Sequence, residues 1–397
     1  IRDLVRSRGL GDVYKRQIVY SAQNGGFMAN MLDYIDWRGD ITIHQSGIND
    51  VDCLIMAQIS YMNFDGVVGN EPAASFGEAV VTLSEASQRL FELRDSATKG
   101  LLLSDNDTLL LKKLASSRRF GSMKLAAYRA VADEEEEKQF GAVCIFPGDA
   151  TVYISYRGTD DTIVGWKEDL NMSFQTPVPS QVEALKYLNT VAGTFEGRIR
   201  IGGHSKGGNL AIYAASYADK PVQERIRGVY CFDGPGFMNH VLDESNFKNI
   251  ASQIHSYVPQ SSVVGMLLGH PVGYTVVEST QLGIYQHDTY SWQVLGRYFV
   301  CLDNVNESSI FMDATLKEWI YSMNSEQRRE FVDAMYAIVQ QTEAKTLLEL
   351  SVNGLKSAKL ILKSMKNMDP STKKMIQRTI SALMKIAGRN IKYNHNM

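Results

Sequence analysis

The segment RIRIGGHSKGGNLAIYAA, residues 198–215, constrains the fold of this chain more than any other. Its apolar residues predict a short strand over Arg198–Gly202 and a helix over Asn209–Ala218, joined by a glycine-rich turn. The chain has no G-x-x-x-x-G-K-[ST] pattern, which argues against a nucleotide-binding loop at this turn. A strand, a tight turn and a helix in this order favour a turn that presents a reactive side chain.

The turn has the form G-x-S-x-G, with Ser205 at its centre. A turn this tight needs small residues on both sides of the serine, and Gly203 and Gly207 supply them. The Ser205 hydroxyl is therefore predicted to stand above the edge of a sheet as a nucleophile. The backbone N–H of Lys206 is expected to point at the oxygen of an attacked carbonyl. His204 is expected to pack beneath the turn.

Strand-like and helix-like segments alternate on both sides of this turn. The alternation predicts an α/β fold in which helices cover both faces of a mostly parallel sheet, as in the α/β-hydrolases. The expected strands are 141–146, 151–156, 198–202, 228–232, 254–258, 274–278 and 292–299. The expected helices among them are 163–173, 178–195 and 209–218. Upstream, a strand-like ITIH at 41–44, a helical stretch over 78–113 and a solvated acidic loop at 133–137 are expected.

After about residue 303 the pattern predicts helices only, at 316–323, 325–341, 345–368 and 370–388. We therefore expect a hydrolase domain over 18–303 and a helical C-terminal region over 304–397. Residues 1–17 are basic, follow no helical period and lack the apolar stretch of a signal peptide. They are expected to be a non-native leader.

Composition favours a soluble globular protein, because 44% of residues are hydrophobic and 21% are charged. No run reaches the roughly 18 apolar residues of a membrane-spanning helix. The four cysteines form no C-x-x-C pair and have no metal-ligand spacing with histidine, so no disulfide framework, metal or organic cofactor is expected. These features predict a cytoplasmic protein.

The C-terminal segment 351–397 is strongly basic. It carries ten Lys or Arg residues against one acid, Asp369, so its charge of about +9 leaves about −12 on the rest of the chain. Its apolar residues share one helical face, which suits either a helix on an anionic membrane surface or an ordinary helix docked on the core. Nucleic acid is not an expected partner, because interleaved aromatic residues are scarce. The oligomeric state stays open.

A second motif, ISYRGTDDTIVGWKEDL at 154–170, follows a predicted strand. An acyl-transfer enzyme needs a second N–H donor for its oxyanion, from a loop after an earlier strand. The Arg157-Gly158-Thr159 segment can supply it.

The strand–RG[ST]–W-x-x-D segment before a G-H-S-x-G turn resembles the class 3 lipases. The blocks RGTDDTIVGWKEDLNMSF, GGHSKGGNLA, FDGPGF, VPQSSVVGMLL, QHDTYSWQV and MLDYIDWRGD resemble more closely a family of bacterial lipase-like proteins known as a domain of unknown function. This resemblance covers about residues 25–345 and implies the α/β-hydrolase fold and reaction class, without a substrate. It also implies that Thr159 is the oxyanion-hole residue and that Trp166 and Asp169 are structural.

A serine nucleophile needs a base, which in this fold follows it in the chain. His287 is the expected base, because it lies in a loop near the end of the hydrolase segment. His270 is the alternative, and His255 is expected to be a core or surface residue of a strand.

The acid that orients the base is expected to be Asp233, which ends the strand after the nucleophile turn. The segment around it resembles that of pancreatic-type lipases, whose Asp is the acid. In class 3 lipases the acid comes from the next strand, where this chain has Ser262. Asp288 and Glu278 are weaker alternatives.

The sequence thus predicts a serine hydrolase of lipid or acyl esters, with Ser205, His287 and Asp233 as its triad. A rival hypothesis is a catalytically weak or inactive scaffold or membrane-associated protein on the same fold. A thioesterase or peptidase is a further alternative, since pocket shape decides between these substrates.

Overall fold

The computed structural model describes residues 29–70, 80–96, 104–160, 162–238, 244–270, 272–341, 360, 363 and 368–394. Within these ranges a nine-stranded sheet has the order β1-β2-β3-β4-β5-β6-β7-β8-β11. The strands are β1 (Val81–Thr82), β2 (Lys124–Asp133), β3 (Lys138–Phe146), β4 (Thr151–Tyr156), β5 (Arg198–His204), β6 (Ile226–Phe232), β7 (Ile254–Pro259), β8 (Thr275–Val277) and β11 (Cys301–Leu302).

The centre of the sheet, β4 to β8, is parallel, whereas β1 to β4 and the β8–β11 pair are antiparallel. Helices cover both faces, and the chain has the predicted α/β-hydrolase fold. On β4, Tyr153 packs with the core on one face and Val152 and Ile154 with the core on the other. This period of two places a hydrophobic core on each side of the sheet.

One face is covered by α2 (Met31–Arg38), α3 (Asp50–Ile59), α4 (Leu83–Ser96) and α5 (Asp105–Ser116). The other is covered by α6 (Ile163–Asn171), α7 (Pro179–Thr194), α8 (Lys206–Tyr217) and α10 (Glu244–Ile250), with the short α9 (Lys220–Gln223) between α8 and β6. Helix α3 is fixed by the buried Asp52, which accepts hydrogen bonds from Tyr34 at 2.8 Å and from Arg119 at 2.7 Å.

Several local predictions need correction. Residues 41–44 form a turn, not a strand, because the backbone N–H of Gln45 donates to the Thr42 carbonyl. The strand expected over 292–299 is a hairpin of β9 (Val294–Leu295) and β10 (Tyr298–Phe299), reversed at Gly296 with φ +63°. Within the helical stretch expected over 78–113, residues 81–82 form strand β1 and the rest of the described residues lie mostly in α4 and α5, while 78–79 and 97–103 lie outside the described residues.

Strand β2 is absent from the predictions because its sequence, KLAAYRAVAD, is rich in alanine and contains a register shift near Ala127. The acidic run 133–137 lies in the exposed turn between β2 and β3, as expected. There the backbone N–H groups of Glu135 and Glu136 donate to the Asp133 carboxylate.

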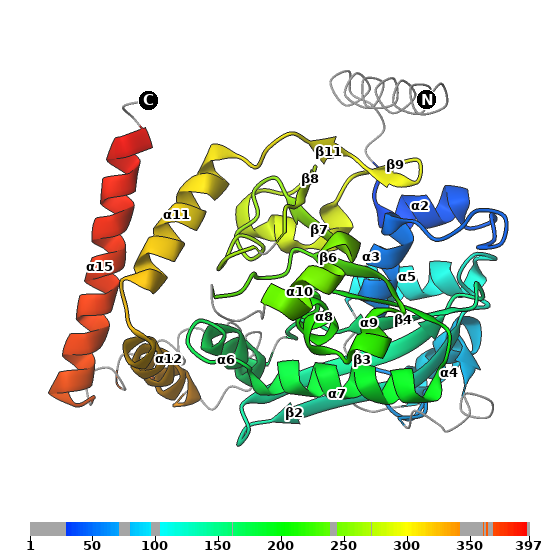
Figure 1. Cartoon of the computed structure of the whole chain (residues 1–397), viewed down its shortest axis with the longest axis horizontal. Coiled ribbons are helices and arrows are strands. Elements are labelled where there is room, and N and C mark those ends of the chain that lie inside the picture. The colour runs from blue at the N-terminus through cyan, green and yellow to red at the C-terminus, as the bar shows by residue number, and fades with distance from the viewer. Residues whose placement is uncertain are drawn as a thin grey trace.

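The C-terminal helices are α11 (Glu307–Tyr321), α12 (Ser325–Gln340) and α15 (Pro370–Asn394). Figure 1 shows them beside one another at the left of the molecule, with α12 next to α6. Helix α11 begins nine residues before the expected 316. The expected leader 1–17 and nearly all of the expected helix 345–368 lie outside the described residues. In the part of the chain that the structure describes, no helix is both long and apolar enough to cross a bilayer.

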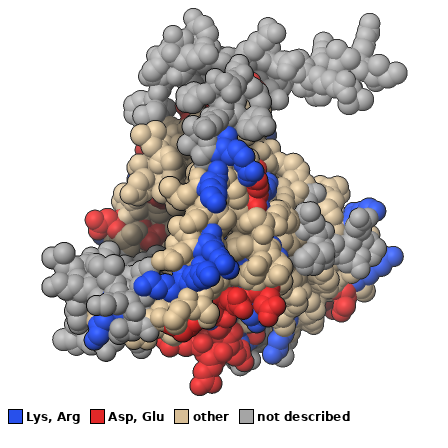
Figure 2. Space-filling view, turned by 90° about the vertical axis from the view of Figure 1, so that its left-hand side faces the viewer, with Lys and Arg blue, Asp and Glu red and all other residues tan. Residues whose placement is uncertain are grey.

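Helix α15 packs against α11 and α12 through part of its apolar face. Ile376 joins a cluster with Ala334 and Ile338 of α12, and Ile386 is also buried. The indole N–H of Trp319 donates to the Thr379 carbonyl at 3.0 Å. Part of the apolar face is therefore used within the chain, while Ile380 and Met384 stay exposed. Figure 2 looks onto this side and shows basic side chains running up the face above a group of acidic ones.

Candidate active site

The turn between β5 and α8 holds Ser205 in an unusual backbone conformation, with φ +57° and ψ −134°. A Cβ atom on Gly203 would lie 2.4 Å from the Tyr156 carbonyl oxygen, and one on Gly207 would lie 2.2 Å from the same atom. Both positions therefore require glycine. The Ser205 N–H donates to the Phe232 carbonyl at 2.9 Å, which ties the turn to the end of β6.

His287 lies at the end of a short 3-10 helix, Gly283–His287. Its Nδ1 atom is 2.7 Å from Oδ2 of Asp233, and its side chain is 26% exposed. The loop is anchored by the buried Gln286, whose side-chain oxygen accepts from the Ser261 N–H at 2.6 Å and whose carbonyl accepts from the Trp292 indole at 2.9 Å. His287 and Ser205 line the same cavity.

Asp233 is fully buried just beyond the end of β6, with a positive φ of +50°. Its Oδ1 atom accepts hydrogen bonds from Oγ of Ser262 at 2.5 Å and from the Gly265 N–H at 3.1 Å. Its own N–H donates to the Tyr257 carbonyl at 2.8 Å. The carboxylate is therefore held on both oxygens, and one of them faces the His287 ring.

The alternative acids and bases have other partners. The Asp288 carboxylate accepts from the Tyr290 N–H at 3.0 Å, and burial raises its pKa. His270 packs on Tyr274 and does not line the cavity. His255, on strand β7, stacks on Tyr230 of strand β6. Glu278 directly follows strand β8 and does not line the cavity. His240 and His395 lie outside the described residues.

His204 does more than pack beneath the turn, because its ring bridges two other segments of the site. Its Nε2 lies 2.9 Å from the His287 carbonyl oxygen and its Nδ1 lies 3.0 Å from the Tyr61 hydroxyl. Since a carbonyl only accepts, Nε2 carries the proton and Nδ1 accepts from Tyr61. Burial and the neighbouring His287 hold the pKa of His204 well below its usual range, so the ring is neutral.

The predicted oxyanion loop lies beside the nucleophile turn. A Cβ atom on Gly158 would lie 2.6 Å from the His204 carbonyl oxygen, so the two segments touch. The Thr159 hydroxyl donates to Oδ2 of Asp169 at 2.6 Å, which fixes the Thr159 side chain. Burial raises the pKa of Asp169 to about 6, although Lys206 and Thr159 oppose the shift. Its other oxygen is buried without a hydrogen-bond partner.

The side chain of Lys206 is buried inside the protein. Its ammonium group donates to Oε2 of Glu168 at 2.9 Å and to the Gln139 carbonyl at 2.8 Å, with both charged side chains fully buried. Glu168 also accepts from the Ser180 N–H at 2.8 Å. Hydrogen bonds therefore connect Lys206 directly to β3 and α6, and through Glu168 to α7.

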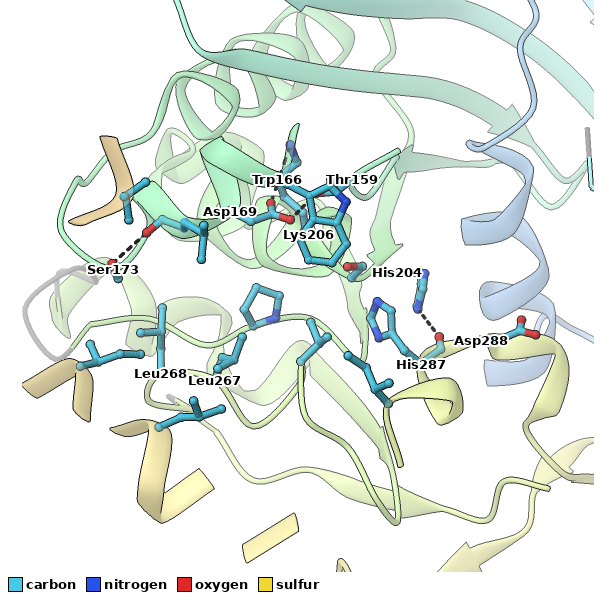
Figure 3. A pocket seen from close by; sticks show the side chains of 18 of the residues that line it. Thr159, Trp166, Asp169, Ser173, His204, Lys206, Leu267, Leu268, His287 and Asp288 are labelled. Carbon is cyan, nitrogen blue, oxygen red and sulfur yellow. Dashed lines mark hydrogen bonds and ion pairs between the residues drawn. The ribbon is translucent and has the colours of Figure 1, made fainter. Parts of the chain in front are cut away.

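A cavity of about 600 Å³ opens above Ser205 and has mostly apolar walls. Figure 3 shows Trp166 and Asp169 on one side of it, Leu267 and Leu268 on the other, and His287 at one end. Helices α11 and α12 complete the wall with Leu316, Trp319, Ile320, Phe331, Val332 and Arg328. The C-terminal helices thus form part of the site.

Sequence reasoning missed Tyr61, Gln286 and the cavity residues of α11 and α12. Tyr61 is 143 residues from His204, and no local pattern marks it as a partner. Within the described ranges, no group of three or more His, Cys, Asp or Glu side chains is arranged to hold a metal ion.

Residues 114–337 match the family model described as Mbeg1-like. Similar solved structures include M37 lipase, with 18% identity and a TM-score of 0.31 over 45% of this chain and 69% of that one. Lip2 lipase from Yarrowia lipolytica is 10% identical, with a TM-score of 0.34 over 59% and 91% of the two chains. Rhizomucor miehei lipase in its propeptide complex is 16% identical, with a TM-score of 0.31 over 49% and 67%. No curated protein matches the chain.

Proposed function

The chain belongs to the Mbeg1-like family, whose model covers more than half of it, and we propose that it is a serine hydrolase of lipid or acyl esters. The observation that carries the proposal is the 2.7 Å contact between His287 and the buried Asp233, next to Ser205 on its strained turn. A base oriented by a carboxylate, in a cavity that a serine also lines, is the arrangement that acyl transfer requires.

In the proposed reaction, Ser205 Oγ attacks the ester carbonyl carbon and its proton passes to Nε2 of His287. Asp233 holds Nδ1 of His287 and stabilises the imidazolium that forms. The N–H groups of Lys206 and Thr159 bind the oxyanion. The C–O bond then breaks, and His287 returns the proton to the leaving alkoxide. A water molecule then attacks the carbonyl carbon of the acyl-enzyme while His287 takes its proton. The carboxylic acid product leaves, and His287 returns the proton to Ser205 Oγ.

The inactive-scaffold hypothesis drew its support from the serine at position 262, where class 3 lipases carry their acid. The hydrogen bond from Ser262 to Asp233 supports the active alternative, because this serine then serves a carboxylate supplied by the neighbouring strand. The mostly apolar cavity favours a hydrocarbon acyl group. A thioester would pass through the same acyl-enzyme, so substrate panels should include one.

A fluorophosphonate probe tests the proposal directly, because it labels only an activated serine. We expect the intact chain to be labelled and to hydrolyse p-nitrophenyl esters. Ser205→Ala should lose labelling and at least about a thousandfold in kcat/KM, with an unchanged melting temperature. Ser116→Ala, which alters an exposed serine on α5, is the matched control. Ser205→Ala activity within about tenfold of wild type would exclude the proposed nucleophile.

A further inference from the structure

The cavity wall that α11 and α12 provide contains one cationic side chain among apolar ones. Arg328, from the first turn of α12, lines the cavity together with Trp319, Phe331 and Val332. The residue is only 9% exposed. A guanidinium in such a place has lost most of its contact with water, so it needs compensating acceptors.

The protein itself supplies few acceptors to this guanidinium. Nη1 of Arg328 donates to the Ile320 carbonyl at 3.1 Å, and Nε is buried without a hydrogen-bond partner. Among the described residues no carboxylate forms an ion pair with it. By contrast, the buried Arg119 pairs with Asp52, and the buried Lys206 pairs with Glu168.

An unpaired buried cation is costly, and burial accordingly lowers the pKa of Arg328. A planar guanidinium binds a carboxylate or phosphate through two parallel hydrogen bonds, and this interaction is stronger out of water. A bound anion would therefore satisfy the donors of Arg328 that have no acceptor among the described residues.

We propose that the cavity takes acyl esters that carry an anionic group, a carboxylate or a phosphate, and that Arg328 binds this group. The inference rests on the proposed hydrolase function. The reacting carbonyl lies at Ser205, the hydrocarbon runs along the apolar wall and the anion meets Arg328. A cavity of about 600 Å³ is within the size range of small-molecule sites.

A purely structural role for Arg328 is the competing explanation, since Ile320 lies in the last turn of α11 and its carbonyl attracts cations. The two roles differ in their dependence on substrate charge. A structural arginine affects neutral and anionic substrates alike, whereas an anion-binding arginine affects chiefly the anionic substrate.

The kinetic test uses mono-p-nitrophenyl sebacate and its methyl ester, which share the chain and the leaving group but differ in charge and by one methyl group. We expect Arg328→Gln to raise KM for the carboxylate ester at least about tenfold, with kcat nearly unchanged and a much smaller change in KM for the methyl ester. Arg328→Lys should recover part of the loss. Arg329→Gln removes the same charge from the next, exposed position and is the matched control. Equal effects of Arg328→Gln on both esters would overturn the inference.

A second pair, 1-acylglycerol phosphate and the matching monoacylglycerol, separates a phosphate from a carboxylate as the preferred anion. A thermal-shift assay of ligand binding gives a readout that needs no turnover. Monomethyl sebacate should raise the melting temperature of wild type but not of Arg328→Gln, and neutral dimethyl sebacate should not distinguish them. If the chain hydrolyses the neutral ester but Arg328→Gln changes neither the KM for the anionic ester nor the thermal shift, this inference fails while the hydrolase proposal stands. If the chain neither hydrolyses esters nor reacts with fluorophosphonate, the hydrolase proposal fails, and the thermal shift still tests the anion site.

Discussion

Ser262 donates a 2.5 Å hydrogen bond to Oδ1 of Asp233, the residue that we propose as the acid of the triad. The second oxygen of Asp233 faces Nδ1 of His287. Asp233 directly follows β6, and Ser262 lies in the turn after β7.

This arrangement predicts unequal costs for the two residues. Asp233→Asn should lower kcat/KM about 10⁴-fold, because the amide favours the wrong tautomer of His287. Ser262→Ala should cost about tenfold or less, because it removes one hydrogen bond to a carboxylate that keeps another. Ser261→Ala, whose side chain contacts Asn306 instead, is the control. Equal losses at positions 233 and 262 would place the acid elsewhere.

The space around Asp233 predicts a strong effect of one added methyl group. A Cβ atom on Gly265 would lie 2.2 Å from Oδ1 of Asp233, so Gly265→Ala must displace the carboxylate. We expect it to reduce ester hydrolysis at least about tenfold. Gly273→Ala, with no atom within 4 Å of its added Cβ, should behave as wild type. Full activity in Gly265→Ala would show that His287 does not need Asp233 in this position.

The neutral His204 predicts a loss of stability in acid. Its pKa is well below the ordinary 6.5 in the folded chain, so as pH falls through 6.5 the unfolded state takes up a proton that the folded state excludes. The stability that the neutral ring contributes is therefore present above pH 6.5 and is lost below it. At about pH 5.5 the loss should be on the order of 1 kcal/mol.

Denaturant unfolding of wild type and His204→Gln at about pH 7.5 and pH 5.5 measures this contribution. The variant should be less stable at the higher pH, because glutamine cannot reproduce both contacts of the ring. It should lose less stability on acidification than wild type does. The same pH dependence in both proteins would mean that other groups cause the loss.

The buried pair of Lys206 and Glu168 predicts strong non-additivity. Lys206→Met leaves an uncompensated carboxylate in the core and should cost about 3–5 kcal/mol of unfolding free energy. Glu168→Leu should be similarly costly for the opposite reason. The double variant should be more stable than either single variant, as measured by thermal unfolding. Additive losses would show that the two charges do not compensate each other.

We propose that exposed lysines on α15 bind anionic membranes in a salt-dependent way. Lys373, Lys374 and Lys385 are exposed, and each basic residue near an anionic surface contributes up to about 1 kcal/mol. We expect the intact chain to co-sediment with anionic vesicles at low salt. Changing these three lysines to glutamine should weaken the binding without unfolding α15, because Ile376 and Ile386 stay packed.

The control changes three exposed lysines elsewhere, Lys112, Lys186 and Lys220, to glutamine. This variant has the same net charge as the α15 variant and should bind vesicles like wild type. Binding that is absent or insensitive to salt in the intact chain would leave α15 as a helix that only supports α11 and α12.

The turn that holds Ser205 could be predicted because its signals are local. Positions 203 and 207 need glycine because a Cβ atom there would overlap atoms of the adjacent backbone. The change from strand to helix periodicity occurs within about 20 residues of sequence. The parallel centre of the sheet could be predicted for the same reason. Strand β2 could not, because its alanine-rich sequence is a strand only through pairing with β3.

The sequence by itself therefore determined the fold class and the position of Ser205, and it narrowed the partners of Ser205 to a few residues. Only the tertiary structure decided that Asp233 meets His287, that Tyr61 reaches His204, and that α11 and α12 close the cavity with Arg328 in its wall. Periodicity reports which face of one element is buried, over a few residues. A hydrogen bond between residues 54 or 143 positions apart depends on strand order and on the paths of loops, which no local pattern encodes.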